Sequence, residues 1–169
     1  MLHADRAADT AAAIDPRELR QVFGCFATGV TIVTAFDATG RPRGMTANSF
    51  TSVSMDPPLI LVCIATSAPL WPVLFLASAF SINVLSEHQR DISQRFATPA
   101  ADKFAGVDWS RAEPEGGPIL ADVAAHLACR RVREVEVGDH MLLIGEVVDF
   151  ARSPSRPLIF HQGAYRAVA

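Results

Sequence analysis

Short runs of β-branched and apolar residues, each closed by turn-forming residues, constrain the fold of this chain more than any other feature. The first run, residues 30–36, reads Val-Thr-Ile-Val-Thr-Ala-Phe. Comparable runs cover residues 59–64, 80–85, 124–150 and 158–165. Such residues favour strands, whereas glycine, proline, asparagine and aspartate favour turns. Because turns at 37–42 and Gly138 join neighbouring runs as hairpins, the pattern predicts a mainly β fold, a small closed β-barrel with a few helices at its ends.

Helical signals are few. Asp15-Pro16-Arg17-Glu18 combines a capping residue with proline at the first helical position, so a helix is expected from there to Gly29. Its apolar side carries Leu19, Val22, Phe23 and Phe26 at helical spacing. A second helix is expected over 68–78, and short helices are expected over 87–105.

The remaining segments complete one domain. Residues 44–53 are expected to form a single strand, 106–117 a surface loop, and 158–165 a last strand. A chain of 169 residues suits one domain. We place that domain at residues 15–169, after a tail at 1–14 that is expected to be disordered.

Charge and composition exclude several classes of protein. The formal net charge is -3, and the basic cluster Arg130-Arg131-Val132-Arg133 is followed by Glu134 and Glu136. We interpret this cluster as a solvated strand face, and we expect no nucleic-acid partner. No apolar run reaches the roughly 18 residues that a membrane span needs. The first 13 residues also lack the apolar core of a signal peptide.

The cysteines indicate the redox compartment. Cys25, Cys63 and Cys129 are odd in number and have no Cys-x-x-Cys spacing. We therefore predict neither a disulfide framework nor a metal site, and we expect a reduced, cytoplasmic protein.

Small and polar residues crowd the stretch Gly-Met-Thr-Ala-Asn-Ser-Phe-Thr-Ser-Val at 44–53. The residues of interest are Thr46, Ala47, Asn48, Ser49, Thr51 and Ser52. Such a pattern commonly forms the polar face of a half-buried strand. It also suits a wall against a flat polar ring, because small side chains let a ring approach the backbone while amides and hydroxyls donate and accept hydrogen bonds.

A single imidazole stands on a tight turn at Gly138-Asp139-His140. A histidine beside an acid on a turn is structural, or simply exposed, about as often as it is functional. The residues alone leave both interpretations open.

Six segments, taken in this order, resemble the short-chain flavin reductase family. They are Phe26–Thr31, Gly44–Phe50, Ser52–Ser54 with Pro57–Ile60 after it, Ile82–Leu85, Gly138–His140 and Gly145–Val147. No single segment is specific for the family, but the six segments in this order are. The resemblance covers roughly residues 19–166.

The resemblance implies a split β-barrel that binds flavin, forms a homodimer and reduces FMN or FAD with NADH or NADPH. Hydride would pass from nicotinamide to flavin, and the reduced flavin would diffuse to a separate monooxygenase. Residues 46–52 would line the flavin. His140 would border the nicotinamide pocket and donate to the nicotinamide carboxamide or the pyrophosphate, so that donor affinity falls as the pH passes through the range in which histidine titrates.

One segment departs from the family pattern. The family often places lysine or arginine after the third strand to hold the flavin phosphate, whereas residues 65–70 here read Ala-Thr-Ser-Ala-Pro-Leu. We expect Thr66, Ser67 and the N–H groups at the start of the next helix to replace that cation, with Arg90 approaching from the following segment.

Two alternatives to a reductase remain. A split-barrel oxidase with tightly bound FMN would need basic residues to hold a substrate phosphate, and these are scarce at 65–70. A flavin-binding carrier or sensor would hold flavin stoichiometrically and consume no NADH.

Overall fold

The computed structural model describes residues 14–168, so residues 1–13 of the expected tail lie outside the described part of the chain. The helices are α1 (Pro16–Gly24), α2 (Trp71–Leu76) and α3 (Arg90–Ala97). The strands are β1 (Thr28–Gly29), β2 (Thr31–Phe36), β3 (Pro42–Ala47), β4 (Thr51–Met55), β5 (Pro58–Ala65), β6 (Ala79–Val84), β7 (Trp109–Arg111), β8 (Pro118–Leu120), β9 (Ala125–Val137), β10 (His140–Arg152), β11 (Ile159–His161) and β12 (Ala164–Arg166).

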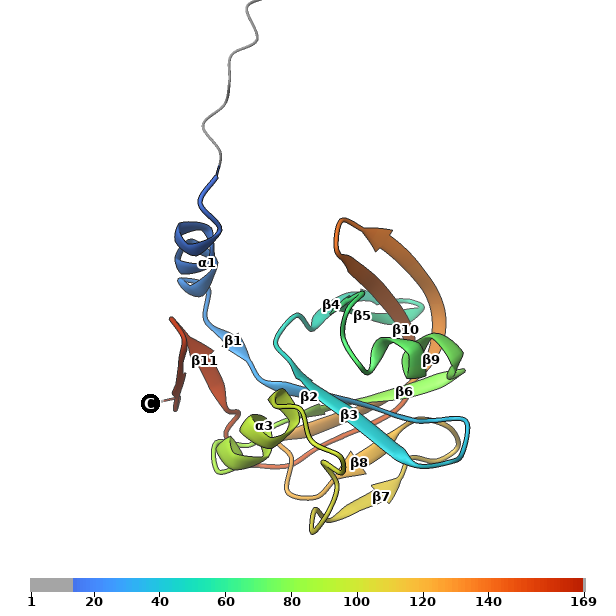
Figure 1. The fold of residues 1–169 in the computed structure, drawn as a ribbon. Helices are drawn as coiled ribbons and strands as arrows, with labels where there is room; N and C mark the ends of the chain where they lie inside the picture. The colour runs from blue at the N-terminus through green and yellow to red at the C-terminus, as the bar shows by residue number, and fades with distance from the viewer. Residues whose placement is uncertain (1–13, 169) are drawn as a thin grey trace, which may run out of the picture.

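Seven antiparallel strands form the main sheet in the order β3-β2-β6-β9-β10-β5-β4. The long strands β9 and β10 bend strongly, so the sheet wraps around its inner face (Figure 1). Its two edge strands, β3 and β4, are joined directly by residues 48–50. This confirms the predicted mainly β split-barrel fold with a few peripheral helices. The expected closure was wrong, because β3 and β4 stand at opposite ends of the strand order and do not pair with each other.

The main sheet is packed on both faces of its central strands. Val33 of β2 belongs to a core with alternate residues of β5, such as Val62, and with Leu74 of α2. The neighbouring Ile32 faces the opposite side and packs with Phe96 of α3. This alternation follows from the two-residue period of a strand, and it fixes α2 and α3 on opposite faces of β2.

Helix α1 begins where the sequence predicts, because the Asp15 side chain accepts a hydrogen bond from the Arg17 N–H at 2.8 Å. It ends at Gly24, five residues earlier than expected. None of its residues is buried, and Val22 and Phe23 are each 66% exposed. In Figure 1, α1 projects away from the main sheet.

The expectation of one strand over 44–53 was wrong. Strand β3 pairs with β2 at one edge of the sheet, whereas β4 pairs with β5 at the other edge. The chain must therefore leave the ladder at 48–50 to pass between the edges, and no glycine or proline marks that break.

Two other segments contain more structure than expected. The predicted loop at 106–117 includes β7, which pairs with β8. The predicted strand at 158–165 is a hairpin, because Gln162 and Gly163 both adopt positive φ and turn the chain back.

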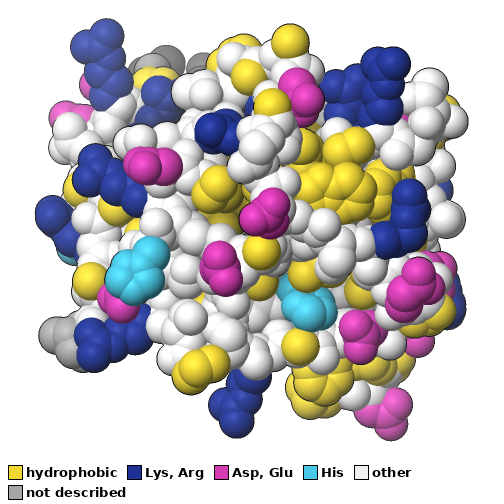
Figure 2. Space-filling model, turned by 90° about the horizontal axis from the view of Figure 1, so that it is seen from below, with side chains coloured by type: hydrophobic (Ala, Val, Ile, Leu, Met, Phe, Trp, Pro, Cys, Tyr) yellow, Lys and Arg dark blue, Asp and Glu magenta, His cyan; other side chains and the backbone are white. Residues whose placement is uncertain are grey.

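Two of the three arginines in the cluster form ion pairs, as expected of a solvated strand face. Arg130 lies 2.6 Å from Glu115, and Arg131 lies 3.1 Å from Glu134. On the face shown in Figure 2, basic and acidic side chains are interspersed. No helix within residues 14–168 combines the length and the apolar character needed to cross a bilayer.

Candidate functional site

Ser49 holds the segment between the two sheet edges. Its Oγ donates to the Cys63 carbonyl at 2.9 Å and accepts from the Cys63 N–H at 3.0 Å. One side chain thus makes both hydrogen bonds that a neighbouring strand would make with Cys63 of β5. This contact seats residues 48–50 against β5, and burial raises the pKa of the Cys63 thiol beside it.

The histidine turn lies at the end of the same strand. His140 pairs with Ala65 in the β10–β5 register, and the Thr66 N–H and Oγ1 both donate to the Asp139 carbonyl, at 3.0 and 3.2 Å. The structure therefore brings together the turn at 138–140 and the segment that follows β5, although more than seventy residues separate them in the chain.

Asp139 orients the imidazole. The Nδ1 of His140 lies 2.7 Å from Asp139 Oδ1, and the side chain of His140 is 45% exposed. The contact with His140 holds the pKa of the Asp139 carboxyl below its usual range. With Nδ1 engaged, Nε2 is the ring nitrogen that remains for a ligand.

A second set of contacts ties Thr46 to distant parts of the chain. Thr46 Oγ1 donates to the Ser93 carbonyl of α3 at 2.7 Å. The Ser93 hydroxyl, which is fully buried, lies 2.8 Å from the Tyr165 hydroxyl of β12. The guanidinium of Arg90 lies over the Tyr165 ring, 5.4 Å from its centre. Arg90 therefore sits at the start of α3, on the side of the fold where Thr46 is anchored.

The predicted site residues separate into two groups. The hydroxyls of Thr46, Ser49 and Thr66 donate to carbonyl groups of the protein. Ala47 and His140 are half-buried. The remaining predicted residues are exposed: Asn48, Thr51, Ser52, Ser67 and Arg90. The first group sets the position of the backbone, and the second group presents polar side chains at the surface.

The start of α2 offers fewer amide donors than expected. Pro69 and Pro72 have no N–H, and the amides of Ala68, Trp71 and Val73 donate within the same turn. The replacement for the missing phosphate-binding cation must therefore come chiefly from elsewhere.

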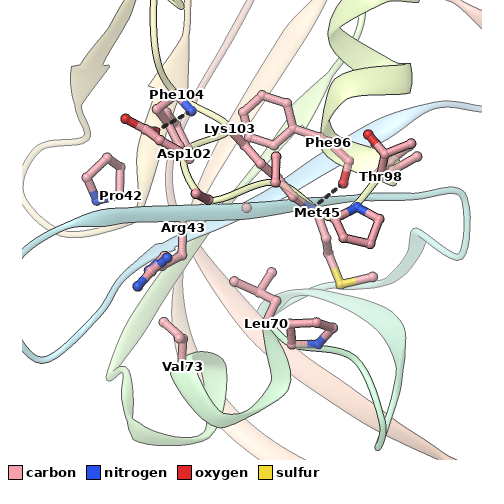
Figure 3. Close-up of a pocket in the computed structure, with 17 residues that line it drawn as sticks. Pro42, Arg43, Met45, Leu70, Val73, Phe96, Thr98, Asp102, Lys103 and Phe104 are labelled. Atoms are coloured by element: carbon pink, nitrogen blue, oxygen red, sulfur yellow. Dashed lines mark hydrogen bonds between the residues drawn. The ribbon is translucent and has the colours of Figure 1, made fainter.

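A cavity of about 350 Å³ adjoins the anchored end of β3 (Figure 3). It lies between β3, the start of α2 and the segment 98–104, and Thr46 and Pro69 are among its lining residues. Two cations, Arg43 and Lys103, are also on its wall. Neither this cavity nor the role of Ser93 could be read from the sequence, because a single serine in a helix and a lysine in a turn-rich segment carry no distinctive pattern.

Comparisons with known proteins point to one family. The family model described as flavin reductase like domain matches residues 23–169. A stachydrine N-demethylase reductase subunit from Rhizobium meliloti is 51% identical over 153 residues, which make up 90% of this chain and 66% of that protein. An NADH-dependent FAD reductase from Streptomyces globisporus is 42% identical over 164 residues, covering 92% of this chain and 89% of the relative.

A solved structure agrees in fold over nearly the whole chain. It is an NADH:FAD oxidoreductase from Streptomyces globisporus in complex with NAD and FAD fragments, with a TM-score of 0.86 and 42% identity, and the match covers 94% of this chain and 98% of that one. Some relatives are longer, and the chain spans half the length of a second Rhizobium meliloti relative that is 53% identical to it.

Proposed function

Because the chain belongs to the flavin reductase-like family, we propose that it is an NADH-dependent flavin reductase that transfers hydride to FAD or FMN. The observation that carries the proposal is the meeting of two segments at one end of β5. Ser49 holds the expected flavin segment against Cys63 of β5. Thr66, the residue directly after β5, donates to the carbonyl of Asp139 in the histidine turn. A flavin and a nicotinamide held by these two segments would share one wall.

The exposed polar groups fit the edge of a flavin ring. Its pyrimidine edge alternates hydrogen-bond donors and acceptors, and the Asn48 amide together with the Thr51 and Ser52 hydroxyls supplies both kinds. The small side chain of Ala47 lets the ring approach the backbone. When bound, the nicotinamide supplies a hydride and the flavin accepts it.

The protein's own contribution is alignment. Ser49, Thr46 and Thr66 fix the backbone on which the ligand-facing residues stand, so the two rings can be held at reacting distance without covalent chemistry. His140, oriented by Asp139, presents Nε2 to the carboxamide or pyrophosphate of the donor. Ser67 and Arg90 are available to the flavin phosphate.

The test is NADH oxidation by the purified protein, followed by absorbance, with and without added FMN or FAD. We expect oxidation that requires added flavin and saturates with it. His140→Ala should raise the KM for NADH severalfold. His88→Ala, which removes an exposed imidazole beside Glu87, should leave that KM unchanged. Stoichiometric flavin binding without NADH oxidation would instead indicate a carrier or sensor.

We also propose that reduced flavin leaves this protein and diffuses to a separate monooxygenase. The name of the Rhizobium relative, a reductase subunit of a demethylase, supports this division of labour. The three free thiols, Cys25, Cys63 and Cys129, suit the reducing cytoplasm in which we place the protein. Reduced flavin that reaches a partner through a dialysis membrane would support transfer by diffusion; transfer only on direct contact would contradict it.

A homodimer is the proposed assembly. The apolar side of α1, with Val22 and Phe23 each 66% exposed and Phe26 just after it 78% exposed, suits burial against a second copy. Light scattering should give a dimer, and Phe23→Ser should shift it toward monomer while Arg20→Ser on the same helix does not. A wild-type monomer would refute the assembly.

A further inference from the structure

The last strand of the described chain is joined to the proposed flavin segment through one serine of α3. The Ser93 hydroxyl lies 2.8 Å from the Tyr165 hydroxyl of β12, and the Ser93 carbonyl accepts a hydrogen bond from Thr46 Oγ1 at 2.7 Å. Thr46 begins the proposed flavin segment, whereas Tyr165 lies outside it, near the C-terminus. A single residue therefore contacts both the end of β3 and β12.

The bond between Ser93 and Tyr165 lies inside the protein. Ser93 is fully buried, and Tyr165 packs against the core that also contains Ile32 and Phe96. A buried serine hydroxyl in a helix would otherwise turn to a carbonyl of its own preceding turn. The Tyr165 hydroxyl thus gives the buried face of α3 a directional bond to β12.

The end of β3 is held by two hydroxyls. Because β3 is an edge strand and pairs with β2 alone, fewer backbone hydrogen bonds fix it than fix a central strand. Thr31 Oγ1 donates to the Ala47 carbonyl at 2.7 Å from within the sheet, and Thr46 Oγ1 donates to α3. The contact with α3 is made to Ser93, the same residue that bonds to Tyr165.

The ring of Tyr165 has contacts of its own, so its hydroxyl can be removed alone. The ring packs edge to face with Phe160, with ring centres 5.5 Å apart, and the Arg90 guanidinium lies 5.4 Å from its centre. Tyr165→Phe keeps the ring that makes both of these contacts. The substitution therefore tests the hydroxyl and not the packing of the β11–β12 hairpin.

Resting on the proposed function, we propose that Tyr165 is a positioning residue for the flavin. Its hydroxyl holds Ser93, and Ser93 in turn holds Thr46, so that β3 ends where the following residues can meet the flavin ring. Tyr165 itself touches no substrate. Because this contact acts on the ring-binding segment and not on the phosphate region at Thr66 and Ser67, it contributes equally to the binding of riboflavin, FMN and FAD.

The direct test is titration of riboflavin, FMN and FAD with the purified protein, followed by quenching of flavin fluorescence. Loss of one neutral hydrogen bond corresponds to about a fivefold change in affinity, so Tyr165→Phe should raise all three Kd values about fivefold. In NADH oxidation the KM for flavin should rise by the same factor, while kcat at saturating flavin stays unchanged.

A double-mutant cycle tests the route through Ser93. Thr46→Val removes the hydroxyl that α3 holds but keeps the shape of the side chain. If Tyr165 acts through Thr46, Tyr165→Phe should weaken flavin binding no further in the Thr46→Val background. Additive losses from the two substitutions would overturn the proposal.

Ser153→Ala is the matched structural control. The half-buried Ser153 follows β10 at the opposite end from His140, and its hydroxyl donates to the Val123 carbonyl at 3.0 Å. Its loss should lower Tm by an amount similar to that in Tyr165→Phe, but it should leave all three flavin Kd values unchanged.

The outcomes separate this proposal from the reductase function. If Tyr165→Phe binds all three flavins as tightly as the wild type, the role of Tyr165 is overturned and the reductase function stands. Weaker binding of FMN and FAD but not of riboflavin would also overturn that role, because the effect would then come from the phosphate region. If the wild type binds flavin without oxidising NADH, the reductase function is refuted, and the three titrations still decide the role of Tyr165.

Discussion

Replacing Ser49 by alanine tests how the candidate site is held in place. The substitution removes two hydrogen bonds to Cys63, one to its carbonyl and one from its N–H, at 2.9 and 3.0 Å. A hydrogen bond of this kind contributes about 0.5–1.5 kcal/mol net, so the pair contributes roughly 2 kcal/mol. Because Ser49 is half-buried, water can reach the freed groups only in part.

For a domain of this size, a loss of about 2 kcal/mol lowers Tm by about 4–8 °C. We expect the same loss in the free energy of unfolding when the flavin-free protein is unfolded in urea and followed by tryptophan fluorescence. The KM for flavin should rise in the same variant, because residues 48–50 lose their attachment to β5.

Ser52→Ala is the matched control, because Ser52 is exposed on the edge strand β4. An exposed serine of this kind should change stability by no more than about 0.5 kcal/mol. A loss in Ser49→Ala no greater than that in Ser52→Ala would refute the argument that the Ser49 hydroxyl replaces a neighbouring strand.

Three further predictions concern the core and the turns. Asn83→Ala should cost about 3 kcal/mol in urea unfolding, because the buried Asn83 amide accepts from a backbone N–H at 2.8 Å and donates to two carbonyls; a loss below 1 kcal/mol would contradict this. Gly145→Ala should cost about 1–3 kcal/mol in thermal melts, since its Cβ would lie 2.6 Å from the Phe80 ring, and an unchanged Tm would contradict it. Hydrogen bonds, the largest from the Thr39 hydroxyl, hold the pKa of Asp37 well below its usual range. Its carboxylate therefore stabilises the fold above the unfolded pKa of about 3.9, and this contribution is lost as the pH falls. Asp37→Asn should flatten the acid side of the stability curve, and an identical acid side would exclude this contribution.

The main sheet could be predicted in outline because hairpins are local. The turn at Gly138 joins β9 and β10, and that glycine adopts a φ of 60°, which its sequence position signals. The turn at Gln162 could not be predicted in the same way, because glutamine is not a usual residue for positive φ. The residues at each turn thus explain why the hairpin at Gly138 was predicted and why the hairpin at Gln162 was missed.

The cavity could not be predicted, since its walls come from separate parts of the chain. Arg43, Val73 and Lys103 lie on β3, on α2 and in the segment after α3. Only the packing of both helices around β2 and β3 places these residues together. Periodicity can show which face of an element is apolar, but it does not show which faces meet.

The sequence alone could not separate the residues within 46–52 whose hydroxyls hold the backbone from those that are exposed, and the reason is geometric. In a continuous strand, residues 46 and 49 are three positions apart, so their side chains point to opposite faces of the sheet. Here both hydroxyls donate into the protein, Thr46 to α3 and Ser49 to β5, because protein packs on both sides of this segment and the ladder breaks after Ala47. Asn48, between them, is left exposed. The same break that carries the chain from one sheet edge to the other therefore leaves the Asn48 amide exposed. In that position the amide can contact a bound flavin ring.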